Sequence, residues 1–175
     1  HELDIDSIHS LDNTTRYQFH TWDNEANKSQ LFIVPGSNST ITAQFFTQYF
    51  LQVNSSYGNP QGEGWYNQDS TALFLVDRYQ YDGKTRHTFD HWSGNVKNDT
   101  ARVTSLIMDS PKTVFANWKT QHFLSVENSG YGVPKGEGWY DQGKEVEFSI
   151  TPPLITMPGD SQVVFAEWKG RGLGS

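Results

Sequence analysis

An internal duplication constrains the fold of this chain more than any other feature. The segment GEGWYNQ at residues 62–68 returns as GEGWYDQ at residues 136–142. The match extends outward, so that TQYFLQVNSSYGNPQGEGWYNQ (47–68) aligns with TQHFLSVENSGYGVPKGEGWYDQ (120–142), with one residue inserted in the second copy. Self-similarity over this length indicates small structural units repeated in tandem.

Two further elements repeat, and their order divides the chain. TRYQFHTWDN (15–24) aligns with TRHTFDHWSG (85–94), and a third element occurs three times, at 34–45, 108–118 and 157–168. The first repeat lacks the GEGWY hairpin, and the last repeat lacks the F-x-x-W strand. The predicted organisation is an N-terminal extended segment 1–14, a partial repeat 15–46, a complete repeat 47–119, a C-terminal repeat lacking one strand 120–169, and a Gly-rich tail 170–175.

Each element has the pattern of an extended strand. In EVEFSI, Val146, Phe148 and Ile150 alternate with polar residues, which predicts one buried face. The third element, which ends in TVFANW in the complete repeat, is expected to close as a hairpin. No window has a convincing helical period, so the predicted fold is all-β: tandem small antiparallel units, sandwich-like, with little or no helix. The tryptophans of the F-x-x-W and third elements are expected to be mostly buried, namely Trp22, Trp92, Trp118 and Trp168.

Composition excludes several classes of protein. The net charge is −7, which argues against nucleic acid or an anionic membrane as a partner. No apolar run approaches the roughly 18 residues of a transmembrane span, so membrane insertion is not expected. The chain has no cysteine, which excludes disulfides and thiolate metal sites.

Glycosylation sequons indicate an extracellular location at the cell surface. Charged residues are only 19% of the chain, a surface composition common in secreted proteins. Because the chain begins at His1 rather than Met, we expect a processed mature form or a fragment. The alternative reading is that Ser/Thr-rich loops generate sequons freely. The candidate sites for covalent N-glycans are Asn13, Asn27, Asn38, Asn54 and Asn98.

The repeated aromatic pairs are the main candidates for ligand binding. Paired aromatic rings can stack on sugar rings, which makes a glycan-binding module the alternative function. The structural alternative is that the glycines permit unusual backbone angles and that the tryptophans cover a core too small to be filled by aliphatic residues. That reading is favoured, because small β units without disulfides need large side chains. The residues concerned are Trp65, Tyr66, Trp139 and Tyr140.

Catalytic and metal-binding patterns are not found. His87 and His91 would share one face of a strand, but the first copy has Tyr17 and Thr21 at these positions, so a metal site is not expected. No nucleophile elbow, zinc-protease motif or phosphate loop occurs. The prediction is therefore a protein that is not an enzyme and that has no cofactor.

The complete repeat resembles the divergent relatives of the internalin-B-type B repeat, a repeat of bacterial and archaeal surface proteins. The resemblance is carried by FLQVNSSYGNPQGEGWY, FDHWSG and SLIMDSPKTVFANW, which fall in the order of that family within residues 50–118. It implies a strand-dominated stalk or adhesion module in a secreted protein, with no catalytic residues to transfer. A non-catalytic appendage of a larger secreted hydrolase is a further alternative.

The two incomplete ends suggest self-assembly. Leu3 and Ile5 alternate with acidic residues as in a half-buried strand, and Ile8 follows. A strand over residues 2–9 could add to the open sheet edge of the C-terminal unit of another copy, which would build a head-to-tail, pilus-like filament by donor-strand complementation. Partners would then be copies of the same chain or other surface proteins. The alternative is a frayed N-terminal tail and a C-terminal unit that closes with a shorter sheet.

Overall fold

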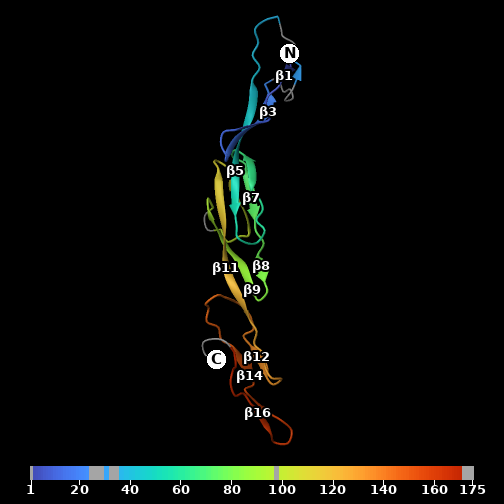
Figure 1. The fold of residues 1–175 in the computed structure, drawn as a ribbon, viewed down its shortest axis with the longest axis vertical. Helices are drawn as coiled ribbons and strands as arrows, with labels where there is room; N and C mark the ends of the chain where they lie inside the picture. Colours follow the sequence, from blue (N-terminus) through green and yellow to red (C-terminus); the bar gives the residue numbers. More distant parts are fainter. Residues whose placement is uncertain (1, 24–29, 32–35, 97–98, 171–175) are drawn as a thin grey trace. The chain divides into compact units, whose positions relative to one another are not determined.

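All regular structure in the described part of this chain is β. The computed structural model describes residues 2–23, 30–31, 36–96 and 99–170 (Figure 1). The predicted all-β class is confirmed, and the described residues contain no helix, so none that could span a membrane. The strands are β1 (Glu2–Leu3), β2 (Ile8–Ser10), β3 (Thr15–Trp22), β4 (Gln30–Leu31), β5 (Ala43–Asn54), β6 (Gly64–Asn67), β7 (Thr71–Leu75), β8 (Tyr79–Asp82), β9 (Thr85–Gly94), β10 (Val103–Ile107), β11 (Lys112–Leu124), β12 (Val133–Lys135), β13 (Gly138–Asp141), β14 (Ser149–Thr151), β15 (Leu154–Thr156) and β16 (Gln162–Val164).

The chain divides into two compact units. The first contains His1–Gln80 and Thr88–Trp118, and the second contains Tyr81–His87 and Lys119–Ser175. Strands β9 and β11 therefore contribute residues to both units. The partial repeat 15–46 and most of the complete repeat fall in the first unit, whereas the C-terminal repeat builds most of the second.

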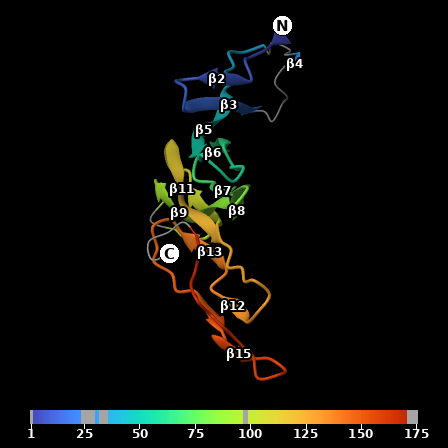
Figure 2. The same ribbon diagram turned by 60° about the horizontal axis from the view of Figure 1, so that its bottom comes forward.

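Two sheets build the complete repeat. One is an eight-stranded sheet with the path β2-β3-β5-β11-β9-β8, in which β6 also pairs with β5 and β13 pairs with β11 (Figure 2). The pairing of β5 with β11 is parallel, and that of β3 with β5 is antiparallel. The other sheet is the antiparallel pair β7–β10.

The hydrophobic core of the first unit joins these two sheets. Strand β7 alternates, with Ala72 and Phe74 buried and Leu73 exposed. This is the period-two pattern of a strand with one face toward a core. Packing between the sheets makes the repeat sandwich-like. The core residues are Leu51, Val53, Ala72, Phe74, Val76, Trp92, Met108 and Val114.

Trp92 of the F-x-x-W strand is the largest fully buried side chain in the core. Its ring meets Phe74 edge-on, with centroids 4.8 Å apart, and its Nε1 donates to the Ala101 carbonyl oxygen at 3.1 Å. Nearby, hydrogen bonds from the Thr104 hydroxyl and the Ala101 N–H hold the pKa of the Asp99 carboxyl below its ordinary value. These bonds fix the loop that supports the indole.

The four tryptophans that are expected to be mostly buried differ in the degree of their burial. Trp22 and Trp92 are buried. Trp118 and Trp168 are only half-buried. The Trp118 Nε1 donates to the Ser55 hydroxyl at 3.0 Å, which keeps one edge of this ring near the surface.

The third repeated element adopts two different pairings, which corrects the expected hairpin for the complete repeat. There, β10 pairs with β7 and β11 pairs with β5, so the two strands lie in different sheets. In the C-terminal repeat the corresponding strands, β15 and β16, pair with each other in a hairpin, as predicted. The local sequence permits both pairings, and the other strands of the unit decide between them.

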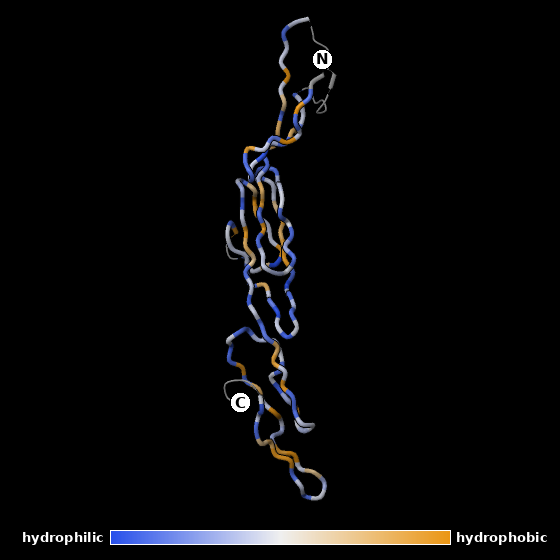
Figure 3. The backbone as a smooth tube through the Cα atoms, in the orientation of Figure 1, coloured by the Kyte–Doolittle hydropathy of each residue, from blue (hydrophilic) through white to orange (hydrophobic). Residues whose placement is uncertain are grey.

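The second unit is built from short strand pairs. Within it, β13 pairs with β11, β12 with β14, and β15 with β16. Apolar residues lie along β15 and β16 (Figure 3), yet Leu154 and Val164 are exposed. Only Val126 is a buried hydrophobic residue among the described residues of this unit.

Candidate functional site

The duplicated GEGWY segments form equivalent strands in identical register. In the first unit β6 pairs with β5, which places Trp65 opposite Phe50. In the second unit β13 pairs with β11, which places Trp139 opposite Phe123. The two pairs of rings meet edge-on at the same centroid distance, 5.3 Å. The same local structure is therefore built twice.

An arginine covers one face of Trp65. The Arg16 guanidinium carbon lies 4.4 Å from the indole centroid, within the range of a cation–π contact. The Arg16 Nε donates to the Gln48 Oε1 at 2.8 Å, and the Gln48 Nε2 donates to the Asn67 Oδ1 at 2.8 Å. We call this set, with its counterpart in the second unit, the arginine–tryptophan clasp.

The second unit repeats the clasp residue for residue. The Arg86 guanidinium lies 4.6 Å from the Trp139 centroid. The Arg86 Nε donates to the Gln121 Oε1 at 2.7 Å, and the Gln121 Nε2 donates to the Asp141 Oδ1 at 2.7 Å. In each unit the clasp therefore holds the start of an F-x-x-W strand against the GEGWY strand.

The tyrosine of each repeated aromatic pair forms a hydrogen bond to the turn that precedes its strand. The Tyr66 hydroxyl donates to the Gly62 carbonyl oxygen at 2.8 Å, and the Tyr140 hydroxyl donates to the Gly136 carbonyl oxygen at 2.9 Å. All four aromatic residues are half-buried. Their rings are thus neither open platforms nor core residues, and each has a structural contact within its own unit.

Clasp residues outside GEGWY were not identified as important from the sequence. The signal was present, because Thr-Arg precedes both F-x-x-W strands and Thr-Gln begins both longer copies. Arg16 aligns with Arg86, and Gln48 aligns with Gln121. Comparing polar as well as aromatic positions of the alignment would have found them.

Removing the guanidinium should loosen the clasp. We expect Arg16→Ala to lower the free energy of unfolding by about 1–2 kcal/mol, because the cation–π contact is lost and Gln48, which is buried, loses a hydrogen-bond partner. Urea unfolding followed by tryptophan fluorescence measures the loss. Arg78→Ala is the matched control, since its guanidinium lies 6.0 Å from the Tyr79 centroid and should contribute less. Equal losses in the two variants would contradict a stabilising clasp.

Three of the five sequon asparagines lie in the described part of the chain. Asn13, in a bend, and Asn38, outside regular structure, are exposed. Asn54 is the last residue of β5 and is half-buried. Its Oδ1 accepts a hydrogen bond from the side-chain Nε2 of Gln52 at 3.5 Å. Asn27 and Asn98 lie outside the described residues.

The N-terminal assembly candidates pair within their own chain. Instead of one strand over residues 2–9, the structure has β1 paired with β4 and β2 paired with β3. Leu3 belongs to β1, Ile5 lies between the two strands and is half-buried, and Ile8 begins β2 and is exposed. Donation of this segment to another copy would require its release from these pairings.

Three titratable side chains of the repeats have local hydrogen-bond partners. The His87 Nδ1 lies 3.2 Å from the Thr120 hydroxyl, and the His91 Nδ1 lies 2.9 Å from the Asp90 carboxylate. The Glu63 carboxylate accepts the Val53 N–H at 3.1 Å. Among the described residues, no three His, Asp or Glu side chains form a group that could hold a metal ion.

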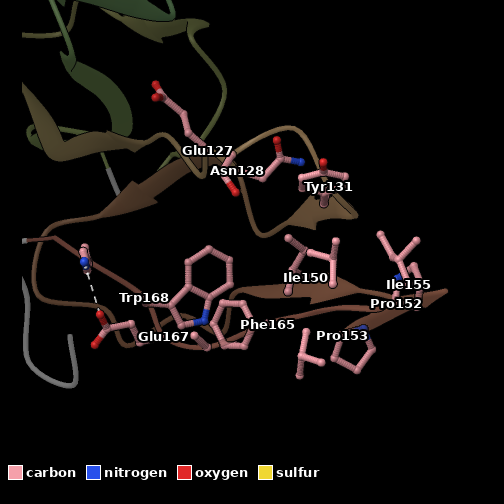
Figure 4. Close-up of a pocket in the computed structure, with 15 residues that line it drawn as sticks. Glu127, Asn128, Tyr131, Ile150, Pro152, Pro153, Ile155, Phe165, Glu167 and Trp168 are labelled. Atoms are coloured by element: carbon pink, nitrogen blue, oxygen red, sulfur yellow. Dashed lines mark ion pairs between the residues drawn. The ribbon is translucent and has the colours of Figure 1, made fainter. Parts of the chain in front are cut away.

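A cavity of about 520 Å³ opens in the second unit (Figure 4). Its wall is mixed, with the apolar residues Ile150, Ile155, Val164, Phe165 and Trp168 beside polar and charged ones. The Phe165 and Trp168 rings contact each other with centroids 5.0 Å apart. The cavity lies in the repeat that the sequence predicts to lack one strand.

Comparisons of the chain with protein-family models, with curated proteins and with solved structures find no significant match.

Proposed function

We propose that this chain is a non-catalytic, secreted structural protein of the cell surface, a stalk or adhesion segment whose copies join head to tail in a filament. The observation that carries the proposal is the duplicated clasp. Residues that recur most closely between the repeats hold strands together in both units. Repetition of a structural contact is expected when a chain extends by adding like units.

Other features agree with this function. The resemblance of residues 50–118 to the B repeat favours a surface stalk or adhesion module. Asn13 and Asn38 are exposed, so a glycan at either position would meet no packed neighbour. An acidic chain with a net charge of −7 also suits a soluble extracellular subunit.

Glycan binding by the repeated aromatics has less support. A sugar-stacking platform needs an open ring face, and guanidinium groups cover one face of both Trp65 and Trp139. The same two indoles also meet the Phe50 and Phe123 rings edge-on. Glycan binding would therefore require either the remaining face or displacement of the arginine.

Assembly of the purified chain tests the proposed function. We expect light scattering after size-exclusion chromatography to show a mass that grows with concentration, and electron microscopy to show unbranched fibres. A variant that lacks residues 2–9 tests the leading segment as donor, since loss of fibres would assign the joint to that segment. A strict monomer at the highest attainable concentration would contradict the filament.

A further inference from the structure

The C-terminal repeat exposes side chains at positions that form the core of the complete repeat. Val114 is 0% exposed, whereas Val164, its counterpart in VVFAEW, is 60% exposed. Phe74 is 0% exposed, whereas its counterpart Phe148 is 38% exposed. Because the residue types are conserved between the repeats, the sequence still encodes a buried core there.

The aromatic contacts show which part of that core is missing. In the complete repeat, the Trp92 ring meets Phe74, and the Phe89 ring meets Trp118 with centroids 5.9 Å apart. The Phe89 and Trp92 rings both belong to the F-x-x-W strand β9. The C-terminal repeat has no such strand, and there Phe148 and Trp168 contact each other directly at 5.0 Å. The partners of Phe89 and Trp92 are present, but the two rings are not.

The first partial repeat has the opposite composition. It carries an F-x-x-W strand, β3, but no GEGWY hairpin of its own. The Phe19 and Trp22 rings lie 5.7 Å apart, close to the 5.5 Å between Phe89 and Trp92. Each end of the chain therefore holds the element that the other end lacks.

Charge favours the same pairing. The C-terminal repeat, residues 120–169, has seven carboxylates and three lysines, and the charged residues that line its cavity are Glu127, Glu167 and Lys169. Glu167 is already paired with Lys169 at 3.3 Å (Figure 4). Strand β3 carries Arg16 and His20 and no carboxylate. Opposite charges on the two surfaces favour their encounter.

We infer that the cavity of the C-terminal repeat is an acceptor site for strand β3 of a second copy of this chain. Phe19 and Trp22 of the incoming strand take the places that Phe89 and Trp92 occupy in the complete repeat. The inference rests on the proposed function, because it names the contact that joins successive copies. Trp22 is buried in its own chain and Arg16 belongs to the clasp, so docking of β3 exchanges these contacts for contacts in the second copy. The contact is heterologous, so successive copies join head to tail, and they form an open filament where the rotation between copies does not close into a ring.

A peptide of residues 15–22 tests the acceptor site directly. Titrated into the full chain, the capped peptide TRYQFHTW should bind with saturable heat and should shift NMR signals of residues that line the cavity. The matched peptide carries Phe19→Ala and Trp22→Ala, keeps the charges, and should bind at least about tenfold more weakly, because two aromatic side chains are no longer buried. Absence of binding, or equal binding of both peptides, would overturn the site.

Two valines of the full chain provide a second, independent test. Val164→Asp places a carboxylate in the proposed interface and should weaken peptide binding at least about tenfold, with a similar loss of assembly. Val133→Asp is the control, since Val133 is 62% exposed and its counterpart in the complete repeat is the exposed Asn59. Both variants should unfold at the wild-type urea midpoint. Equal binding by both variants would overturn the inference.

The results separate this inference from the proposed function. Peptide binding by a chain that never forms fibres would support the acceptor site and contradict the filament. Fibres that form unchanged with Val164→Asp would support the filament and contradict the acceptor site. Fibres lost on deletion of residues 2–9, with no binding of the β3 peptide, would assign the joint to the leading segment and overturn the inference.

Discussion

Replacing Trp92 by alanine is expected to lower the free energy of unfolding of the first unit by about 3–5 kcal/mol. The indole is fully buried among side chains of both sheets. The variant loses the edge contact with Phe74 and leaves the Ala101 carbonyl oxygen without the Nε1 donor. Because the surrounding strands cannot collapse into so large a space, the cavity itself adds to the loss. Urea unfolding followed by circular dichroism measures the change.

Trp168→Ala is the matched control for this experiment. Trp168 is half-buried, and its ring contacts Phe148 and Phe165 of the C-terminal repeat. We expect a smaller cost, about 1–3 kcal/mol, because part of the ring is already in contact with water and its removal leaves no enclosed cavity. If both substitutions cost the same, Trp92 does not have the central role in the core that its burial indicates.

The fold class could be predicted because the strand signals are local. Alternation in TALFLV and the turn-rich segments between strands depend only on neighbouring residues. The sheet to which a strand belongs could not be predicted in the same way. VTSLI and LITM have similar patterns, yet β10 pairs with β7 whereas β15 pairs with β16. The difference depends on a strand distant in sequence, which a local pattern does not encode.

The candidate site was half predictable. The repeat located Trp65 and Trp139, and the structural reading of both agrees with their contacts to Phe50 and Phe123. The covering arginine was missed, because Arg16 lies 49 positions before Trp65 and only pairing of β3 with β5 and of β5 with β6 brings them together. Such contacts follow from the order of strands in the sheet.

The N-terminal strand shows a different limit of the sequence pattern. Alternation at Leu3 and Ile5 indicates extended chain but does not name the partner of that strand. The structure pairs β1 with β4 and β2 with β3, both within the chain. An edge strand has the same local pattern whether its partner is its own chain or another copy, so assembly must be tested by experiment.

Gly62→Ala is expected to destabilise the first unit by about 2–5 kcal/mol, because two costs add. Gly62 has φ of +98°, a region in which an alanine costs about 1–2 kcal/mol. A Cβ would also lie 2.3 Å from the Leu73 carbonyl oxygen and 2.7 Å from the Phe74 Cα, so the backbone of β7 would have to move, at about 1–3 kcal/mol. Thermal and urea unfolding measure the combined loss.

Gly83→Ala separates the two costs. Gly83 also has positive φ, +58°, but a Cβ there meets no atom within 4 Å, so only the backbone term of about 1–2 kcal/mol should remain. Gly136→Ala should resemble Gly62→Ala, because its Cβ would lie 2.7 Å from the Glu147 carbonyl oxygen. If Gly62→Ala costs no more than Gly83→Ala, the close approach relaxes without penalty. A larger cost at Gly62 and Gly136 alone would explain the first glycine of GEGWY in both repeats, since that residue lies against the backbone of Leu73 in one repeat and of Glu147 in the other.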